Sequence, residues 1–348
     1  MSDEATSSPT ARPPTARRLL SGIQPSGDLH LGNYLGAIRN WVDLVSKYDA
    51  FYCVVDLHAI TVPFEPDRLA ERTVEMARGL VACGLDPARC TLFVQSHVPG
   101  HAELAWIFST IAPLGALERM TQWKDKAAQH RESENLGLFA YPVLQSADIA
   151  LYKAAVVPVG EDQVQHLELA REIVRKFNRL FGETFPEPQP LLTATARVLG
   201  LDGKSKMSKS KGNTIPLFEP DGATWEKLRT AVTDENRKRR TDPGNPDVCN
   251  VYSLHRFFTP TDRVAVIDRE CRVAGIGCVD CKKILHEHLS AHLTPIRERY
   301  GSKDASAATV RDALRDGAAR AATVARTTME EVKARVGLLD AGPSPGRG

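Results

Sequence analysis

Between residues 19 and 180, short apolar runs alternate with longer stretches of helical period. Four apolar runs have the length of buried strands, at residues 19–23, 51–55, 92–94 and 154–159. Helical stretches follow them at residues 31–45, 69–81 and 166–177. Strands that alternate with helices predict an α/β fold with a parallel sheet covered on both faces, and such sheets bind ligands at the carboxyl ends of their strands.

After about residue 217, helical patterns dominate the chain. They cover residues 225–232, 284–297 and 310–336, with a segment rich in cysteine between the first two. We expect an α/β domain at residues 18–217 and a mostly helical domain at 218–338. Tails at 1–17 and 339–348 are predicted to be disordered, because they are rich in small and polar residues and contain no apolar periodicity.

Charge and composition exclude several classes of protein. Forty-five basic and 43 acidic residues give a formal charge of +2, which argues against coating nucleic acid through bulk charge but leaves room for a local basic patch that handles one RNA. We find no apolar run of about 18 residues and no secretory signal in the first 18, so we expect no membrane association. The seven cysteines then predict a reducing, cytoplasmic location.

Residues 21–33 (Ser-Gly-Ile-Gln-Pro-Ser-Gly-Asp-Leu-His-Leu-Gly-Asn) join the first predicted strand to the first helix. Proline and glycine favour a tight turn, and Gly32 lets a ligand approach the backbone closely. The free amides at a helix N-terminus attract phosphate, and His30 can donate a hydrogen bond to phosphate oxygens without a full charge. A phosphate-binding turn fits these residues, but so does a histidine that only caps a helix.

Residues 206–210 (Lys-Met-Ser-Lys-Ser) lie in a polar loop after an apolar stretch at 198–199. Two lysines and two serines can surround a triphosphate with charges and hydroxyl donors, although a solvated basic loop has the same composition. The two segments together, in this order and about 175 residues apart, are more specific than either one alone.

These two segments resemble the paired signatures of class I aminoacyl-tRNA synthetases. Further blocks resemble the bacterial tryptophanyl-tRNA synthetases, at residues 22–27, 55–61, 117–124, 146–149 and 157–163. The resemblance extends from about residue 19 to residue 338. Tyrosyl-tRNA synthetases share the architecture but differ at the last three of these blocks.

The resemblance implies a Rossmann-like parallel-sheet catalytic domain, with dimer-interface helices and the 206–210 loop at its end, followed by a helical anticodon-binding domain. It implies a homodimer that activates L-tryptophan with ATP and Mg²⁺, releases pyrophosphate and esterifies tRNA(Trp). Because the attacking carboxylate of tryptophan is already ionised at neutral pH, no general base is required. Positioning and electrostatic stabilisation of phosphate charge are then the expected sources of catalysis.

The resemblance also assigns individual residues to the nucleotide. Those expected to contact ATP are Gln24, Pro25, Ser26, Gly32, Asn33, Gly160, Glu161, Asp162, Val198, Lys206, Met207, Ser208, Lys209 and Ser210. The catalytic candidates are His30, Asn33, Lys126, Lys206, Lys209 and Ser210. Glu161 and Asp162 belong to a ribose-binding turn, where a carboxylate can accept from ribose hydroxyls.

For tryptophan, the resemblance places Asp148 against the indole N–H, Tyr141 and Gln163 at the ammonium group, and His58 near the same pocket. Gln145 stands where many relatives carry methionine, which affects ligand selectivity rather than the reaction. The apolar neighbours of Asp148 in the sequence favour burial, and a buried carboxylate needs a partner such as an indole N–H.

Four of the cysteines, Cys249, Cys271, Cys278 and Cys281, cluster in the helical part of the chain. Four thiolates that include a Cys-x-x-Cys turn suit a tetrahedral Zn²⁺ or a cubane iron–sulfur cluster, and chance clustering of free thiols is the third possibility. The resemblance to synthetases with this spacing favours a 4Fe–4S cluster near the anticodon-reading surface, with Zn²⁺ as the alternative. The basic run at 237–240 is either a solvated face or a contact with the tRNA backbone.

Two functions therefore remain open. The first is an enzyme that charges tRNA(Trp) with tryptophan. The second is a non-charging paralogue that binds tryptophan or tRNA in a regulatory or partner-binding role. The intact His30, Asn33, Lys206 and Lys209 favour the enzyme, because a regulatory relic is expected to lose some of them.

Overall fold

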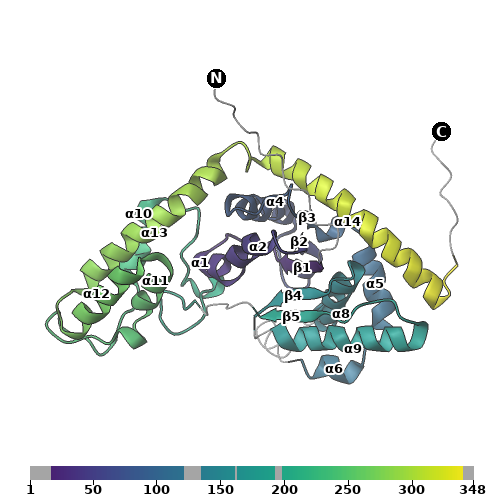
Figure 1. Cartoon of the computed structure of the whole chain (residues 1–348), viewed down its shortest axis with the longest axis horizontal. Helices are drawn as coiled ribbons and strands as arrows, with labels where there is room; N and C mark the ends of the chain where they lie inside the picture. The colour runs from purple at the N-terminus through teal and green to yellow at the C-terminus, as the bar shows by residue number, and fades with distance from the viewer. Residues whose placement is uncertain (1–16, 121–134, 161–162, 193–197, 340–348) are drawn as a thin grey trace.

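The computed structural model describes residues 17–120, 135–160, 163–192 and 198–339. In these residues five strands form one sheet: β1 (Arg18–Ile23), β2 (Asp49–Val54), β3 (Thr91–Val94), β4 (Val156–Val159) and β5 (Gln189–Leu192). Their order is β3-β2-β1-β4-β5, and every neighbouring pair is parallel (Figure 1). The predicted α/β fold with a Rossmann-like parallel sheet is confirmed. Since the strand order reverses at β1, a ligand crevice is expected between the carboxyl ends of β1 and β4.

Helices cover both faces of this sheet, as the alternating pattern predicts. The helices of the first part are α1 (Leu31–Asn33), α2 (Arg39–Leu44), α3 (Asp56–Ala59), α4 (Pro66–Ala82), α5 (Gly100–Ser109), α6 (Leu114–Glu118), α8 (Leu136–Leu151) and α9 (Val164–Phe181). Successive residues of β1 enter different cores: Leu19 packs with residues of α2 and α4, and Leu20 with residues of α5, α8 and α9.

Two local features of this half are not predicted by the sequence. The helix expected at 31–45 contains a π-helical segment, η1 (Tyr34–Ile38), between α1 and α2. Strand β5 has a proline at position 190 and exposed residues at both ends, so it lacks the apolar run by which the other strands are recognised. An edge position tolerates such a strand, because only one side of its backbone must be paired.

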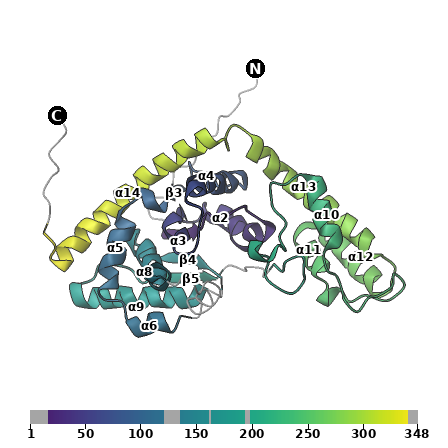
Figure 2. The same cartoon turned by 180° about the vertical axis from the view of Figure 1, so that it is seen from behind.

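The C-terminal part is helical, as predicted. It contains α10 (Asp221–Thr230), a 3₁₀ turn η6 (Pro246–Val248), α11 (Asn250–Phe258), α12 (Thr261–Arg272), α13 (Cys278–Gly301) and α14 (Ala307–Val336). Figures 1 and 2 show α10–α13 on one side of the molecule, with α14 crossing back over the sheet half beside β3, α4 and α5. A Cβ at Gly317 would lie 1.8 Å from the carbonyl oxygen of Leu92, so only glycine lets α14 pack this closely on β3.

The cores of the two halves are continuous. One cluster of buried side chains joins Leu19 of β1 with Leu289 and Leu293 of α13 and Leu314 of α14. In the described residues this cluster extends across the boundary expected at residue 217, because side chains of α13 and α14 pack with those of the sheet half. The predicted tails lie almost wholly outside the described residues. Within those residues, no helix is long and apolar enough to cross a membrane.

Candidate active site

The loop between β1 and α1 holds His30 by two backbone contacts. The Nδ1 atom of His30 accepts a hydrogen bond from the amide of Gly32 at 3.1 Å, and the amide of His30 donates to Oδ1 of Asn33 at 3.1 Å. Burial, followed by the charges of Lys209 and Lys206, lowers the pKa of His30 to about 4. At neutral pH the ring is therefore neutral. Since Nδ1 accepts, the proton lies on Nε2, which is left as a donor. His30 therefore caps the helix through Nδ1 and still has an N–H donor at Nε2. The two roles expected from the sequence, helix capping and phosphate binding, are compatible.

The second loop, at residues 206–210, is built on a buried asparagine that the sequence does not single out. Asn213 accepts from the amide of Ser208 at 2.8 Å and donates to Oδ2 of Asp202 at 2.9 Å. A Cβ at Gly200 would lie 2.0 Å from Nδ2 of Asn213, so this glycine makes room for the asparagine. Met207 is buried, and its amide donates to the carbonyl of Val198 at 3.0 Å.

The two loops meet, although about 175 residues separate them in the sequence. The amide of Leu31 donates to the carbonyl of Ile215 at 2.9 Å, and that of Leu217 donates to the carbonyl of Leu29 at 2.9 Å. Nζ of Lys209 donates to the carbonyl of Ser26 at 2.7 Å. The structure thus brings His30, Asn33, Lys206 and Lys209 to one place after β1, with a positive charge suited to phosphate.

A cavity of about 300 Å³ opens beside these loops, between the carboxyl ends of β1 and β4. Its lining combines apolar side chains with polar groups that can orient a ligand, as in small-molecule sites. The lining residues are Leu20, Ser21, Gly22, Gln24, Cys53, Val55, His58, Tyr141, Gln145, Asp148, Ile149, Val157, Pro158, Val159 and Gln163. All five residues predicted to bind tryptophan are among them.

Asp148 is the central polar group of this cavity. It is 5% exposed and accepts hydrogen bonds from Nε2 of His58 at 2.8 Å, from Nδ1 of His101 at 2.7 Å and from Nε2 of Gln95 at 2.8 and 3.0 Å. Burial opposes ionisation, but the hydrogen bonds from His101 and His58 outweigh it and hold the pKa of the Asp148 carboxyl below its ordinary range. The cavity therefore presents a buried, ionised acceptor. The sequence does not single out Gln95 or His101, and the only signal for Gln95 is its position directly after β3.

The remaining predicted residues are only partly described. Gly160 follows β4, and its carbonyl accepts from the amide of Gln163 at 3.0 Å. Lys126, Glu161 and Asp162 lie outside the described residues, as does the side chain of Ser210. Tyr141 contacts a further residue that the sequence does not single out, since its hydroxyl lies 2.7 Å from Nε2 of His166.

Comparison with known proteins places this geometry in a family. Residues 14–294 match the tRNA synthetases class I (W and Y). The chain belongs to this family. A tryptophan–tRNA ligase of Deinococcus radiodurans is 55% identical over 327 residues, which cover 92% of this chain and 99% of that protein. Tryptophan–tRNA ligase 2 of Streptomyces avermitilis is 47% identical over 332 residues, covering 93% and 98%.

Solved structures agree with this membership. The tryptophanyl-tRNA synthetase of Campylobacter jejuni, complexed with ADP and tryptophan, has a TM-score of 0.83 and 35% sequence identity, covering 92% of this synthetase and 100% of that chain. A second structure of tryptophanyl-tRNA synthetase from the same organism has a TM-score of 0.81 and 35% sequence identity. The predicted resemblance to class I synthetases is confirmed.

The four clustered cysteines of this synthetase lie near one another in the helical part. Cys249 precedes α11, Cys271 is on α12, and Cys278 and Cys281 begin α13. Burial, followed by the charges of the other three, raises the pKa of Cys281 to about 12. Across the part of the chain that is described, no group of three or more His, Cys, Asp or Glu side chains forms a site that could hold a metal ion.

Arg237, the first residue of the basic run at 237–240, contacts two of these cysteines. Nη1 of Arg237 lies 3.9 Å from the sulfurs of both Cys271 and Cys278, and its Nη2 donates to the carbonyls of Arg240 and Ile276 at 2.7 and 2.9 Å. The three following side chains, at 238–240, are exposed. Four thiols are donors of a kind that iron or zinc accepts, and two of them lie beside the same guanidinium.

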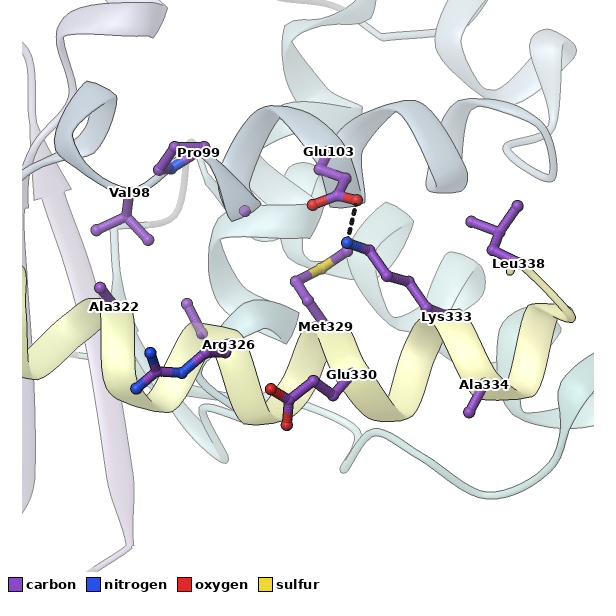
Figure 3. A pocket seen from close by; sticks show the side chains of 12 residues that line it. Val98, Pro99, Glu103, Ala322, Arg326, Met329, Glu330, Lys333, Ala334 and Leu338 are labelled. Atoms are coloured by element: carbon purple, nitrogen blue, oxygen red, sulfur yellow. Dashed lines mark ion pairs between the residues drawn. The ribbon is translucent and has the colours of Figure 1, made fainter. Parts of the chain in front are cut away.

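Figure 3 shows a second hollow, of about 480 Å³, between the start of α5 and the last turns of α14. An ion pair of 2.7 Å between Glu103 and Lys333 lies across it. Its lining includes neither the phosphate loops nor Asp148. It is a seam where α14 crosses the catalytic half and is separate from the active site.

Proposed function

We propose that this synthetase is a tryptophan–tRNA ligase, which activates L-tryptophan with ATP to tryptophanyl-adenylate and then esterifies tRNA(Trp). The observation that carries this proposal is the ionised carboxylate of Asp148 in a cavity of about 300 Å³ beside the two phosphate loops. An ionised carboxylate accepts hydrogen bonds only, and the indole N–H is a single donor of matching chemistry. Identity of up to 55% to tryptophan–tRNA ligases supports the same function.

In the first step a carboxylate oxygen of tryptophan forms a bond to the α-phosphorus of ATP. The bond from that phosphorus to the bridging oxygen breaks, and its electrons leave with pyrophosphate, so no proton transfer is needed. His30 would donate from Nε2 to phosphate oxygens, and Lys206 and Lys209 would balance the charge that develops. His30, Lys206 and Lys209 are not Mg²⁺ ligands, so Mg²⁺ would arrive on the ATP phosphates.

The other residues divide between the two substrates. ATP would be contacted beside these loops by Gln24, Pro25, Ser26, Gly32 and Val198, and in the second loop by Met207, Ser208 and Ser210. Lys126 remains a catalytic candidate. The turn of Gly160, Glu161 and Asp162 would bind the ribose. Tyr141 and Gln163 would hold the ammonium group of tryptophan, while His58 and Gln145 would shape the wall around the indole, a placement that their position in the cavity supports.

In the second step a hydroxyl of the 3′-terminal adenosine attacks the carbonyl carbon of the adenylate, and AMP leaves. We assign anticodon recognition to the helical part from α10 to α13, with the exposed residues at 238–240 on the tRNA backbone. Contacts of this type make tRNA affinity fall as salt increases.

We propose that Cys249, Cys271, Cys278 and Cys281 hold a 4Fe–4S cluster, with Zn²⁺ as the alternative. The proximity of the four thiols supports this proposal. Burial raises the pKa values of Cys249, Cys271 and Cys281, so metal loading would release protons from these thiols. Protein purified without oxygen is expected to contain iron and sulfide and to absorb broadly near the edge of the visible range. Stoichiometric zinc without iron would support the alternative, and neither metal would contradict both.

We also propose that the enzyme is a cytoplasmic homodimer. Three large apolar side chains are exposed on helices that pack together: Trp106 of α5 at 74%, Leu114 of α6 at 62% and Leu136 of α8 at 78%. A surface of this kind is typical of protein interfaces. All seven cysteines are free, which fits a reducing compartment.

The alternative is a paralogue that binds tryptophan or tRNA without charging. Charging of a tRNA(Trp) transcript by the full-length protein separates the two functions. Esterification that depends on both ATP and tryptophan is the expected result. Tryptophan binding without esterification of the tRNA would favour the regulatory alternative.

A further inference from the structure

Two residues hold Asp148 from the side away from the cavity. Gln95 and His101 are fully buried, and neither lines the cavity, whereas His58 does. His101 links Oδ1 of Asp148, at 2.7 Å from its Nδ1, to the hydroxyl of Tyr152, at 2.8 Å from its Nε2. Its ring also stacks on Phe93, with centroids 5.9 Å apart. The carboxylate is thus fixed from behind by Gln95 and by a chain of two side chains, His101 and Tyr152, none of which the proposed chemistry otherwise uses.

With His101 in its neutral form, the hydrogen bonds of this chain have one consistent arrangement. An ionised carboxylate only accepts, so Nδ1 of His101 carries a proton and donates. In a neutral ring Nε2 then accepts, and the Tyr152 hydroxyl donates to it. Tyr152 therefore selects the tautomer of His101 that points an N–H at Asp148.

Gln95 gives independent evidence that the surroundings impose the orientation of the Asp148 carboxylate. Its amide nitrogen donates to both oxygens of Asp148, while its own Oε1 is buried with no hydrogen-bond partner in the described part of the chain. An amide oxygen facing the carboxylate would be repelled, so the amide keeps its nitrogen toward Asp148 at the cost of an unpaired acceptor. The surroundings therefore fix the carboxylate before a ligand enters.

We propose that His101, oriented by Tyr152, is a positioning residue that sets the discrimination of this site between tryptophan and amino acids of the same shape that lack the indole N–H. This inference rests on the proposed function, because it assumes that Asp148 accepts from the indole. A site built to hydrogen-bond a substrate N–H rejects an analogue without it, since its own polar group is left unpaired. If the Asp148 carboxylate is no longer held in one orientation, the site discriminates less strongly against the analogue without the N–H.

The test compares kcat/KM for tryptophan and for 3-(benzothiophen-3-yl)alanine, in which sulfur replaces the N–H, in ATP–pyrophosphate exchange. His101→Phe keeps the ring but removes the donor, and we expect it to lower the tryptophan preference about tenfold, the lower end of the effect of a hydrogen bond to a charged group. His101→Asn keeps an N–H at the position of Nδ1 and is expected to retain most of the preference. His97→Asn, at an exposed histidine four residues earlier, is the matched control and leaves the preference unchanged.

A purely structural role predicts a different outcome. Equal loss of kcat/KM for both amino acids in His101→Phe would overturn the proposal. If that variant does not fold, Tyr152→Phe decides, because it removes only the hydroxyl: we expect a preference about threefold lower, and an unchanged preference would overturn the proposal. If the wild-type enzyme shows no exchange with tryptophan, the proposed function itself fails, which this series distinguishes from failure of the positioning role.

Discussion

Lys209 is the residue whose charge we expect to limit the use of ATP at alkaline pH. Its Nζ reaches from the 206–210 loop to the loop after β1, where it lies 2.7 Å from the carbonyl oxygen of Ser26. Burial lowers the pKa of Lys209 to about 8, with Asp28 opposing the shift and Arg72 adding to it. A lysine with this pKa is about nine-tenths charged at pH 7 and about one-tenth charged at pH 9. Because kcat/KM reports the free enzyme, its value for ATP should fall about tenfold over this range.

The assay is pyrophosphate exchange at saturating tryptophan, with ATP varied between pH 7 and pH 9. Lys209→Arg keeps its charge over the whole range, so the ratio of wild type to this variant cancels the titration of the substrates. Lys211→Arg, at an exposed lysine of the same loop, is the matched control and should follow the wild-type profile. A wild-type profile parallel to that of Lys209→Arg would refute the reasoning.

Three further substitutions test other parts of the site and fold. Asp148→Asn should lower kcat/KM for tryptophan about 10- to 100-fold with little change in KM for ATP, since it removes one charged hydrogen-bond acceptor; equal effects on both substrates in steady-state exchange would argue against a role at the indole. Asn213→Ala removes the bonds to Ser208 and Asp202 and should raise KM for ATP about tenfold, without a comparable change in KM for tryptophan. Gly317→Ala should destabilise the protein by about 1–3 kcal/mol in chemical unfolding, because of its overlap with the Leu92 carbonyl. Gly301→Ala, which meets nothing within 4 Å, is the control and should have a much smaller effect.

Most strands of the catalytic half could be predicted because each contains an apolar run that is recognisable in the sequence. Each of the strands β1 to β4 contains a run of buried apolar residues, as is typical of strands covered on both faces. Strand β5 lies at the edge and carries Pro190, so its sequence lacks that signal. The return of α14 across β3 was also not predicted, since helical periodicity gives the apolar face of a helix but not the surface that covers it.

In the active site, too, local sequence signals identify some residues and miss others. His30, Asn33 and Lys209 stand in contiguous signatures, and their meeting follows from the resemblance. The support of Asp148 comes from Gln95 and His101, which are 53 and 47 residues away in the sequence and belong to no quoted block. Contacts of this kind are set by how α5 and α8 pack on one another, and no local pattern encodes them.

The most direct test of the central claim is amino-acid-dependent exchange of labelled pyrophosphate into ATP by the full-length protein. Tryptophan and tyrosine are supplied separately under the same conditions, because the family includes synthetases for both. Exchange with tryptophan and none above background with tyrosine is the predicted result. Exchange with tyrosine alone, or with neither amino acid, would contradict the assignment of Asp148 and the proposed function.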